Sequence, residues 1–377
     1  MIHFFIGTKA QLIKLAPVIE EILKRQVEHR LIDTSQHSRT TAELIRLFKL
    51  RGPDVVLNER RDNIDKIWDA FVWFTKDILK LVMCGKKIRN HVFQDKGGVC
   101  VVHGDTLSTL LSLLYAKRCG LKVVHVESGL RSYDVFNPFP EEIIRLISMK
   151  MSDYLIAPSR KAFQALCSMG YRSKSLLVEG NSGKDAALKI IKQISYDSIP
   201  LGVQHEKFVL VTIHRAENIY NQQRMKLLCD VVKQTSDTMH VVFVLHDPTR
   251  IQLKKFGLLD KLSHTKNVSC VELQPYNNFL KLMINAGCVM TDGGSIQEEC
   301  SYFDIPCIVL RSSTERSDGL GKNAILSNYD VALIHEFVGN VHSVTRNQNE
   351  YIDIKNDTSR KIAQYIEELH KREMNCL

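Results

Sequence analysis

Residues 99–129 read VCVVHGDTLSTLLSLLYAKRCGLKVVHVESG, and this stretch decides the fold class. Two valine-rich runs, Val99–Gly104 and Lys122–Glu127, flank a segment of helical length at Leu107–Arg118. A continuous apolar run is typical of a strand that is buried on both faces, and a helix that joins two such strands makes them parallel. The stretch therefore predicts a parallel strand–helix–strand unit.

The same alternation of apolar strands and amphipathic helices extends in both directions along the chain. The remaining strands are expected at Ile2–Gly7, His29–Asp33, Tyr154–Pro158, Leu176–Gly180, Phe208–His214, Val241–His246, Val268–Leu273, Val289–Asp292 and Cys307–Arg311. These strands form two runs, one in each half of the chain. We therefore predict an α/β protein with two doubly wound, Rossmann-like domains.

A glycine-containing turn marks the boundary between the two runs. The chain has 377 residues, which suits two domains of roughly 150 residues each. Gly180–Gly183 forms the turn, and the weakly periodic segment Ile194–Glu206 follows it. We expect an N-terminal domain over residues 1–180, a C-terminal domain over residues 181–358, and a helix in residues 359–377 that packs back on the N-terminal domain.

Composition excludes several classes of protein. Hydrophobic residues make up 44% and charged residues 25% of the chain, which excludes a disordered protein or a coiled coil. No apolar run approaches the roughly 18 residues of a membrane helix, and no signal peptide is evident. The ten cysteines contain no C-x-x-C pair, so we expect reduced, buried thiols, no metal site and a cytoplasmic location.

The net charge of +9 suits an anionic partner. Lysine and arginine residues are interspersed with acidic residues along the chain, whereas a nucleic-acid surface requires basic clusters on one face. We therefore expect no nucleic-acid partner. A small anionic ligand such as a nucleotide fits the charge better.

Carboxylates follow the expected strands of the first half. In doubly wound sheets, ligands bind beyond the carboxyl ends of the strands. Asp105 and Glu127 each follow a strand, and Glu141 stands where a proline-containing loop enters a helix. Carboxylates that cluster in a cleft can serve as general acid and base. The alternative is helix capping, which Asp105 and Glu141 would also suit.

The second half carries a histidine and a glycine turn at its expected strand ends. Gly293, Gly294 and Ser295 open a helix, where free amide groups suit a diphosphate, although a simple turn is the alternative. Glu299 could accept hydrogen bonds from ribose hydroxyls or interact with the helix dipole. His214 ends a strand and is either catalytic or structural. In the first half, Lys9 and Lys14 could counter a phosphate or be solvated.

Together these motifs resemble those of one family, the UDP-N-acetylglucosamine 2-epimerases of the non-hydrolysing bacterial type. The resemblance runs in order along nearly the whole chain. Its motifs are Gly7–Lys9 with Ile13–Pro17, Gln36–His37, Val102–Thr106, His125–Arg131, Pro140–Glu142 with Arg145, His214–Asn218, Thr291–Glu299, and Arg311 with Thr314–Arg316. Each motif is weak by itself, but eight in sequence order are specific.

The resemblance implies a glycosyltransferase-B-like fold with the active site in a cleft. The second domain would mainly hold UDP, and the sugar would face the first. The reaction needs no NAD or other cofactor: a base removes the C2 proton, UDP leaves to give a glycal, and readdition gives UDP-ManNAc for surface polysaccharide. It also implies a homodimer.

The residue roles follow from the same resemblance. The matched catalytic set is Asp105, Glu127, Glu141 and His214. The matched substrate-binding set is Lys9, Lys14, His37, Arg145, Gly293, Gly294, Ser295, Glu299 and Arg316.

The chain departs from the family pattern at five places. Lys9–Gln11 replaces Arg-Pro-Glu, Gly293–Ser295 replaces Ser-Gly-Gly, and Ile144 replaces an asparagine. Ser317 and Asp318 replace the proline and glutamate after Arg316, and Arg39 stands where a second glutamine often follows Gln36. These changes leave open the exact nucleotide sugar and allosteric activation by substrate. The alternatives are a hydrolysing 2-epimerase that releases UDP and ManNAc, a glycosyltransferase of the same fold, and a nucleotide-sugar-binding protein without turnover.

Overall fold

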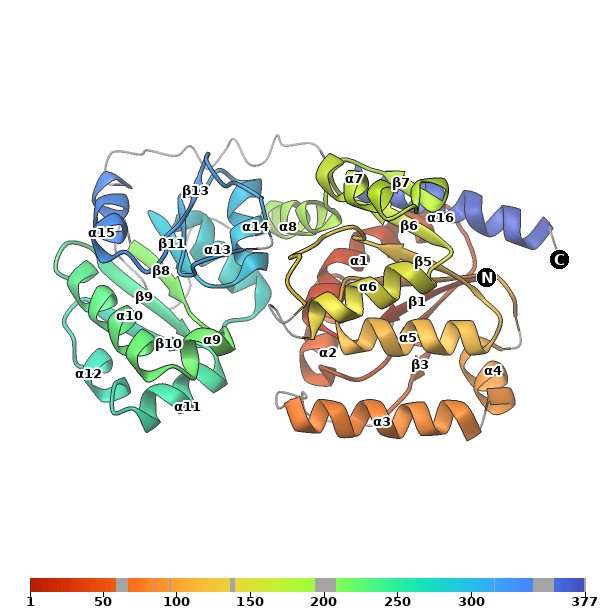
Figure 1. Cartoon of the computed structure of the whole chain (residues 1–377), viewed down its shortest axis with the longest axis horizontal. Coiled ribbons are helices and arrows are strands. Elements are labelled where there is room, and N and C mark those ends of the chain that lie inside the picture. Colours follow the sequence, from red (N-terminus) through yellow and green to blue (C-terminus); the bar gives the residue numbers. More distant parts are fainter. Residues whose placement is uncertain are drawn as a thin grey trace. The chain divides into compact units, whose positions relative to one another are not determined.

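A computed structural model of the chain describes residues 1–58, 67–83, 85–94, 96–135, 140–193, 208–314, 316–341 and 356–375. The chain divides into two compact units (Figure 1). Unit 1 comprises Met1–Ala186 with Lys355–Leu377, and unit 2 comprises Ala187–Ile354. The predicted fold class, α/β with two doubly wound sheets, is confirmed. The domain boundaries expected at 180 and 358 stay predictions, and the structure divides the chain at 186 and 354.

Unit 1 contains a parallel sheet of seven strands in the order β3-β2-β1-β4-β5-β6-β7. The strands are β1 (Ile2–Ile6), β2 (His29–Asp33), β3 (Val55–Val56), β4 (Val99–His103), β5 (Lys122–Val126), β6 (Tyr154–Ala157) and β7 (Ser175–Leu177). All five residues of β1 and of β4 are buried, as expected for strands covered on both faces. The strand order reverses between β1 and β4, which is where ligands bind in such sheets.

The helices of unit 1 are α1 (Lys9–Lys24), α2 (Ser38–Leu47), α3 (Ile67–Met83), α4 (Gly85–Phe93), α5 (Leu107–Arg118), α6 (Glu141–Met151), α7 (Arg160–Ser168) and α16 (Thr358–Asn375). α8 (Ser182–Gln193) begins in unit 1 and ends in unit 2. α1 packs between α2 and α16, and α5 packs between α3 and α6. α16 buries Ile362, Ala363, Ile366 and Leu369.

A capping box begins α1. Thr8 accepts a hydrogen bond from the Gln11 amide, and the Gln11 side chain accepts one from the Thr8 amide at 3.1 Å. The side-chain nitrogen of Gln11, Nε2, also donates to the His103 carbonyl at 3.0 Å. A glutamate could not make this donation, so the glutamine ties the start of α1 to the end of β4.

Unit 2 contains a parallel sheet of six strands in the order β10-β9-β8-β11-β12-β13. The strands are β8 (Phe208–Thr212), β9 (His240–Leu245), β10 (Val268–Glu272), β11 (Cys288–Thr291), β12 (Cys307–Val309) and β13 (Ala324–Leu326). The helices are α9 (Ala216–Ile219), α10 (Gln222–Thr235), α11 (Asp247–Lys255), α12 (Leu259–Ser263), α13 (Tyr276–Asn285), α14 (Gly294–Tyr302) and α15 (Val331–Asn340).

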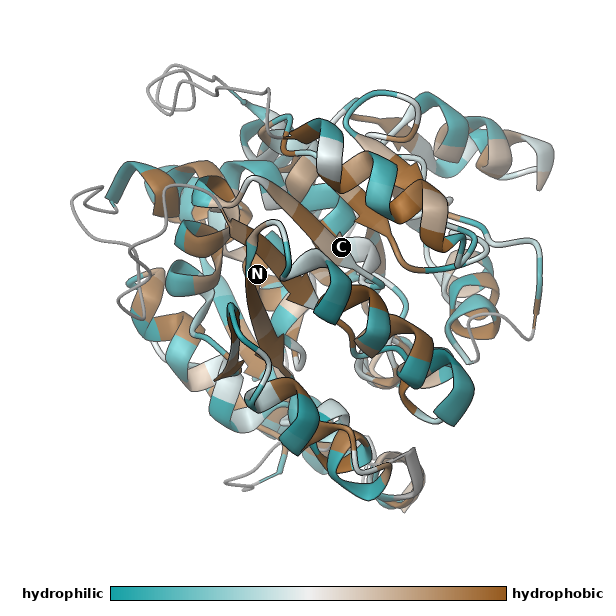
Figure 2. Ribbon diagram, turned by 90° about the vertical axis from the view of Figure 1, so that its left-hand side faces the viewer, coloured by the Kyte–Doolittle hydropathy of each residue, from teal (hydrophilic) through white to brown (hydrophobic). Residues whose placement is uncertain are grey.

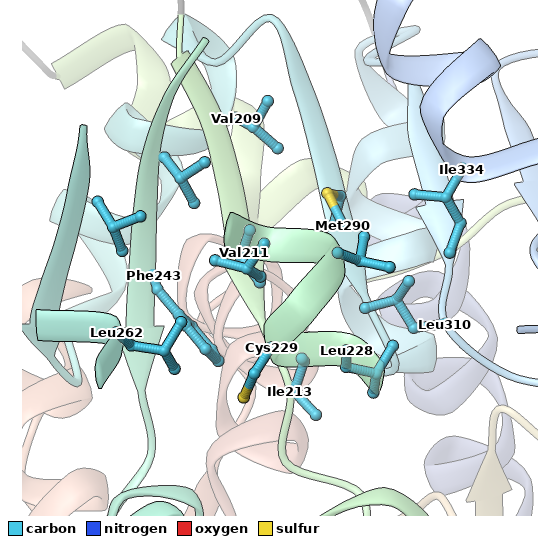
Figure 3. Close-up of a cluster of buried hydrophobic side chains, with 14 of the residues drawn as sticks. Val209, Val211, Ile213, Leu228, Cys229, Phe243, Leu262, Met290, Leu310 and Ile334 are labelled. Atoms are coloured by element: carbon cyan, nitrogen blue, oxygen red, sulfur yellow. The ribbon is translucent and has the colours of Figure 1, made fainter. Parts of the chain in front are cut away.

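The core of unit 2 lies between its sheet and its helices. Figure 3 shows Val211, Phe243 and Met290 from three neighbouring strands beside Leu228 of α10 and Ile334 of α15. In Figure 2 the strands carry mostly apolar colours, whereas the helices alternate between apolar and polar colours. This is the pattern of buried strands and amphipathic covering helices. Among the described residues, no helix combines the length and the apolar character needed to cross a membrane.

Candidate functional site

The predicted catalytic carboxylates of unit 1 follow two neighbouring strands. Asp105 comes after β4 and Glu127 directly after β5, so both lie at the carboxyl edge of the parallel sheet. Glu127 has a φ of 61°, in the left-handed region. This conformation costs a non-glycine residue on the order of 1 kcal/mol and persists only where the surroundings hold it.

The Glu127 side chain is buried, and polar side chains from three other segments approach one of its oxygen atoms. Its Oε2 atom lies 2.5 Å from Lys14 Nζ, 2.9 Å from Asn181 Nδ2 and 3.4 Å from His103 Nε2. The side chains of Lys14 and Glu127 are 7% and 6% exposed. A buried charge needs an opposite charge and hydrogen bonds. Lys14 therefore supplies the charge that keeps a carboxylate in this position.

Arg145 joins Asp105 to the interior of unit 1. One nitrogen of its guanidinium, Nη2, lies 2.5 Å from Asp105 Oδ2, and Nη1 lies 3.2 Å from Glu142 Oε2. Glu142 is fully buried and also binds Arg131 and the Ser132 amide. Burial alone would raise the pKa of Glu142, but the hydrogen bonds from Arg131 and Ser132 outweigh it and lower that pKa. The buried Glu142 carboxylate thus holds Arg145 in place beneath Asp105.

The other predicted residues of unit 1 occupy helix starts at the same edge of the sheet. Lys9 is the first residue of α1, His37 precedes α2, and Glu141 is the first residue of α6. Lys14 is buried against Glu127, which excludes the solvated alternative for this residue. The diphosphate contact expected for Lys14 stays a prediction.

His214 of unit 2 follows β8 and is held by Asp292, which follows β11. The two carboxylate oxygens of Asp292 accept hydrogen bonds from the His214 amide at 2.9 and 3.1 Å. His214 Nδ1 lies 3.4 Å from Asp292 Oδ1, and Asn218 Nδ2 donates to Asp292 Oδ2 at 2.9 Å. Burial raises the pKa of Asp292, and the hydrogen bonds from Asn218 and the two backbone amides oppose this. The His214 ring also stacks on His246, with centroids 4.6 Å apart.

The predicted phosphate turn lies beside this histidine. Gly293 caps α14, Gly294 is its first residue, and Ser295 is exposed at its second position. A side chain at Gly293 would place its Cβ only 2.7 Å from His214 Cε1. Any larger residue at 293 would therefore displace the His214 ring. The first-turn amides of α14 lie at the carboxyl edge of the sheet.

Glu299 and Arg316 each bind a neighbour that their motifs did not predict. The Tyr276 hydroxyl donates to Glu299 Oε1 at 2.9 Å. Burial raises the pKa of Tyr276, and the charge of Glu299 raises it further, so the phenol remains a donor. Arg316 Nη1 lies 2.7 Å from Glu298 Oε2.

Sequence reasoning left out several residues that complete these clusters. Glu142 and Asp292 stand inside motifs already noted, next to Glu141 and Gly293. Their position in these motifs could have indicated that they belong to the site. Asn181 and His103 approach Glu127 only through the folding of the chain. In the described ranges, no group of three or more His, Cys, Asp or Glu side chains is placed to hold a metal ion.

Comparison with known proteins gives one consistent result. A family model described as UDP-N-acetylglucosamine 2-epimerase matches residues 20–367. A relative from Methanocaldococcus jannaschii with the same name is 31% identical over 345 residues, which are 88% of this chain and 90% of the relative.

Two solved structures resemble the chain over nearly its full length. The M. jannaschii UDP-GlcNAc 2-epimerase in complex with UDP-GlcNAc and UDP matches with a TM-score of 0.81 and 29% identity, covering 97% of this chain and 99% of that one. The Neisseria meningitidis UDP-GlcNAc 2-epimerase bound to UDP-GlcNAc matches with a TM-score of 0.80 and 26% identity over the same shares of the two chains.

Proposed function

The chain belongs to the UDP-N-acetylglucosamine 2-epimerase family, and from this premise we propose that it converts UDP-GlcNAc into UDP-ManNAc without releasing free sugar. The observation that carries the proposal is the pair of anchored carboxylates at the carboxyl edge of unit 1. Asp105 is bound to Arg145 and Glu127 to Lys14. Each carboxylate is held in one orientation by a buried cation.

The C2 proton of the sugar is weakly acidic, so its removal needs a base that is close and well aimed. We assign the proton transfers to Asp105, Glu127 and Glu141. One carboxylate takes the proton from C2 while the bond between C1 and the diphosphate oxygen breaks, and UDP leaves with the bonding electrons. UDP then adds back to C1, and a protonated carboxyl returns a proton to the opposite face of C2.

Unit 2 would bind and stabilise the UDP that leaves. Negative charge builds on the diphosphate in this step, and helix N-terminal amides stabilise such charge. In this proposal the diphosphate binds at the start of α14, at Gly293, Gly294 and Ser295, and Glu299 binds the ribose. His214, fixed by Asp292, acts on the departing diphosphate.

Proton NMR of the protein with UDP-GlcNAc in D₂O, without added cofactor or metal, tests the reaction. We expect deuterium at C2 together with UDP-ManNAc. Free UDP with N-acetylmannosamine would instead show the hydrolysing reaction. A spectrum that does not change would reject UDP-GlcNAc as the substrate.

Three variants test the assigned residues. Asp105→Asn, Glu127→Gln and His214→Ala should each lower kcat at least about 100-fold, as expected for groups that transfer protons or stabilise the transition state. Glu28→Gln is the matched control, because Glu28 is an exposed carboxylate, paired with Lys96, at the opposite edge of the sheet. Near-parent activity in all three variants would reject the site.

We further propose that the protein acts as a homodimer in the cytoplasm. The apolar side chains Phe71, Leu79, Val82 and Met83 on α3 are 54–81% exposed, and a second copy would cover them. Light scattering after gel filtration should give twice the mass of 43.1 kDa. Leu79→Glu should shift the population to monomer, and a monomeric parent would reject the proposal.

A further inference from the structure

Asn181 lies in the turn between β7 and α8, outside the eight motifs quoted for the family resemblance. Its Nδ2 atom donates to Glu127 Oε2 at 2.9 Å. Lys14 and His103 approach the same oxygen atom. Because Lys14 and Asn181 donate to this oxygen atom from different segments of the chain, they fix the orientation of the Glu127 carboxylate group.

The orientation of the Asn181 amide is defined by two hydrogen bonds. Its oxygen, Oδ1, accepts a hydrogen bond from the Gly183 amide at 2.8 Å. The side-chain nitrogen, Nδ2, therefore points toward Glu127. A flipped amide would place its nitrogen against an N–H donor and its oxygen against a carboxylate. The side chain therefore has a single favourable orientation, with its N–H group on the carboxylate.

The backbone of this turn is held by the start of α16. Asn356 Nδ2 donates to the Asn181 carbonyl at 3.4 Å, across 175 residues of sequence. A Cβ at Gly180 would lie 2.2 Å from Thr358 Oγ1, so only glycine allows this approach. Two residues after Gly183, the Asp185 carboxylate accepts from the Ser359 amide and hydroxyl at 2.7 and 2.5 Å. α16 is thereby attached to the segment that carries Asn181.

We propose that Asn181 is a positioning residue for Glu127 and that the docking of α16 sets its position. Proton transfer at C2 would then depend on a helix that contributes no residue to the reacting groups. The inference rests on the proposed function, because it takes Glu127 as one of the groups that transfer the proton. A purely structural turn would predict loss of stability with kcat retained in the folded protein.

Asn181→Asp separates these two readings. The variant keeps the oxygen that accepts from Gly183, but it places a negative charge where Glu127 now receives a donor. Within the described ranges, the titratable groups near Glu127 include Lys14 from α1, His103 from β4 and His125 from β5. None of them changes in the variant. A like charge disfavours ionisation, so Glu127 should lose its proton at higher pH.

The experiment combines carboxyl ¹³C NMR titration with steady-state kinetics on the full chain. Glu127→Gln identifies the Glu127 signal by its loss. In Asn181→Asp, we expect the midpoint of that signal to rise by at least one pH unit. In the kinetics, kcat should fall about 10- to 100-fold while KM changes less than threefold. The acid limb of the profile of kcat against pH should move to higher pH. Asn181→Ala removes the donor without adding a charge, so it should lower kcat with a smaller upward movement. Asn90→Asp, on the exposed face of α4, is the matched control and should change neither quantity.

Asn356→Ala tests the contribution of α16. It removes the donor to the Asn181 carbonyl, and we expect kcat to fall about three- to tenfold with KM retained. Parent-like kcat in Asn356→Ala would overturn the role of α16. An unchanged Glu127 midpoint in Asn181→Asp would overturn the role of Asn181, whether or not the protein turns over substrate. A raised midpoint in a protein that shows no exchange at C2 would reject only the proposed function.

Discussion

Replacing Gly293 by alanine should displace the His214 imidazole without unfolding the protein. The new Cβ would lie 2.7 Å from His214 Cε1, whereas carbon atoms prefer a separation of about 3.5–4.0 Å. The ring must therefore retreat by about 1 Å. The His214 side chain is 31% exposed, so it can move. The backbone φ of −85° at Gly293 also suits alanine, and we expect a loss of about 1 kcal/mol in the free energy of unfolding.

The effect on the reaction should be much larger than the effect on stability. A misplacement of about 1 Å can cost about 100-fold in rate, which corresponds to about 2.7 kcal/mol in the activation free energy. The moved ring would also leave its stack on His246 and its approach to Asp292. We therefore expect kcat to fall about 100-fold.

The assay is the initial rate of deuterium incorporation at C2, measured beside urea unfolding of the same samples. Gly339→Ala is the matched control, because Gly339 lies in α15 with no atom within 4 Å of the added Cβ. It should keep full activity and gain about 0.5–1 kcal/mol of stability from the helix. If Gly293→Ala works at a rate within threefold of the parent, His214 does not have the assigned role in this orientation.

Three further outcomes are expected. Glu142→Gln leaves its buried arginine partners without their carboxylate and should cost about 3–5 kcal/mol in urea unfolding; a loss below about 1 kcal/mol would contradict the pairing. Burial lowers the pKa of His125 to about 4, so its contribution to stability is complete above about pH 6.5 and is lost toward pH 4, because the unfolded chain binds the proton first. Burial raises the pKa of Asp33 to about 6, so this group changes stability with pH in the opposite direction. The measurement is therefore the difference in unfolding free energy between the parent and His125→Gln at each pH. The same pH dependence in both proteins would contradict the role of His125. Glu299→Ala should weaken UDP binding about tenfold by calorimetry, and an unaltered affinity would reject the ribose contact.

The main strands could be predicted because they are buried on both faces. β1, β4, β5, β8 and β11 carry continuous apolar runs, and such runs are visible in the sequence alone. β3, with two residues, is too short for a pattern, and the three apolar residues of β13 stand alone between Asn323 and Ser327. They form strands because an adjacent strand offers them hydrogen bonds, which is a property of the folded sheet.

The location of the candidate site could also be predicted, but the hydrogen-bond and ion-pair partners of its residues could not. Parallel strands end at one edge of a sheet, which places Asp105 near Glu127 and His214 near Gly293 from their positions alone. The partners of these residues come from distant segments whose approach depends on packing. Asn181, which donates to Glu127, gives no local signal of that contact in the sequence.

The position of α16 also has a consequence for the order of events during synthesis on the ribosome. α16 completes unit 1 by packing on α1, yet the whole of unit 2 is translated between the two parts of unit 1. At about 5–20 residues per second, on the order of ten to thirty seconds pass between them. Throughout that interval the face of α1 that α16 will cover is exposed on the nascent chain. Unit 1 is therefore the first unit to enter synthesis, but it can complete its fold only after unit 2 has been made. During that interval the uncovered face of α1 is a surface that a chaperone could bind.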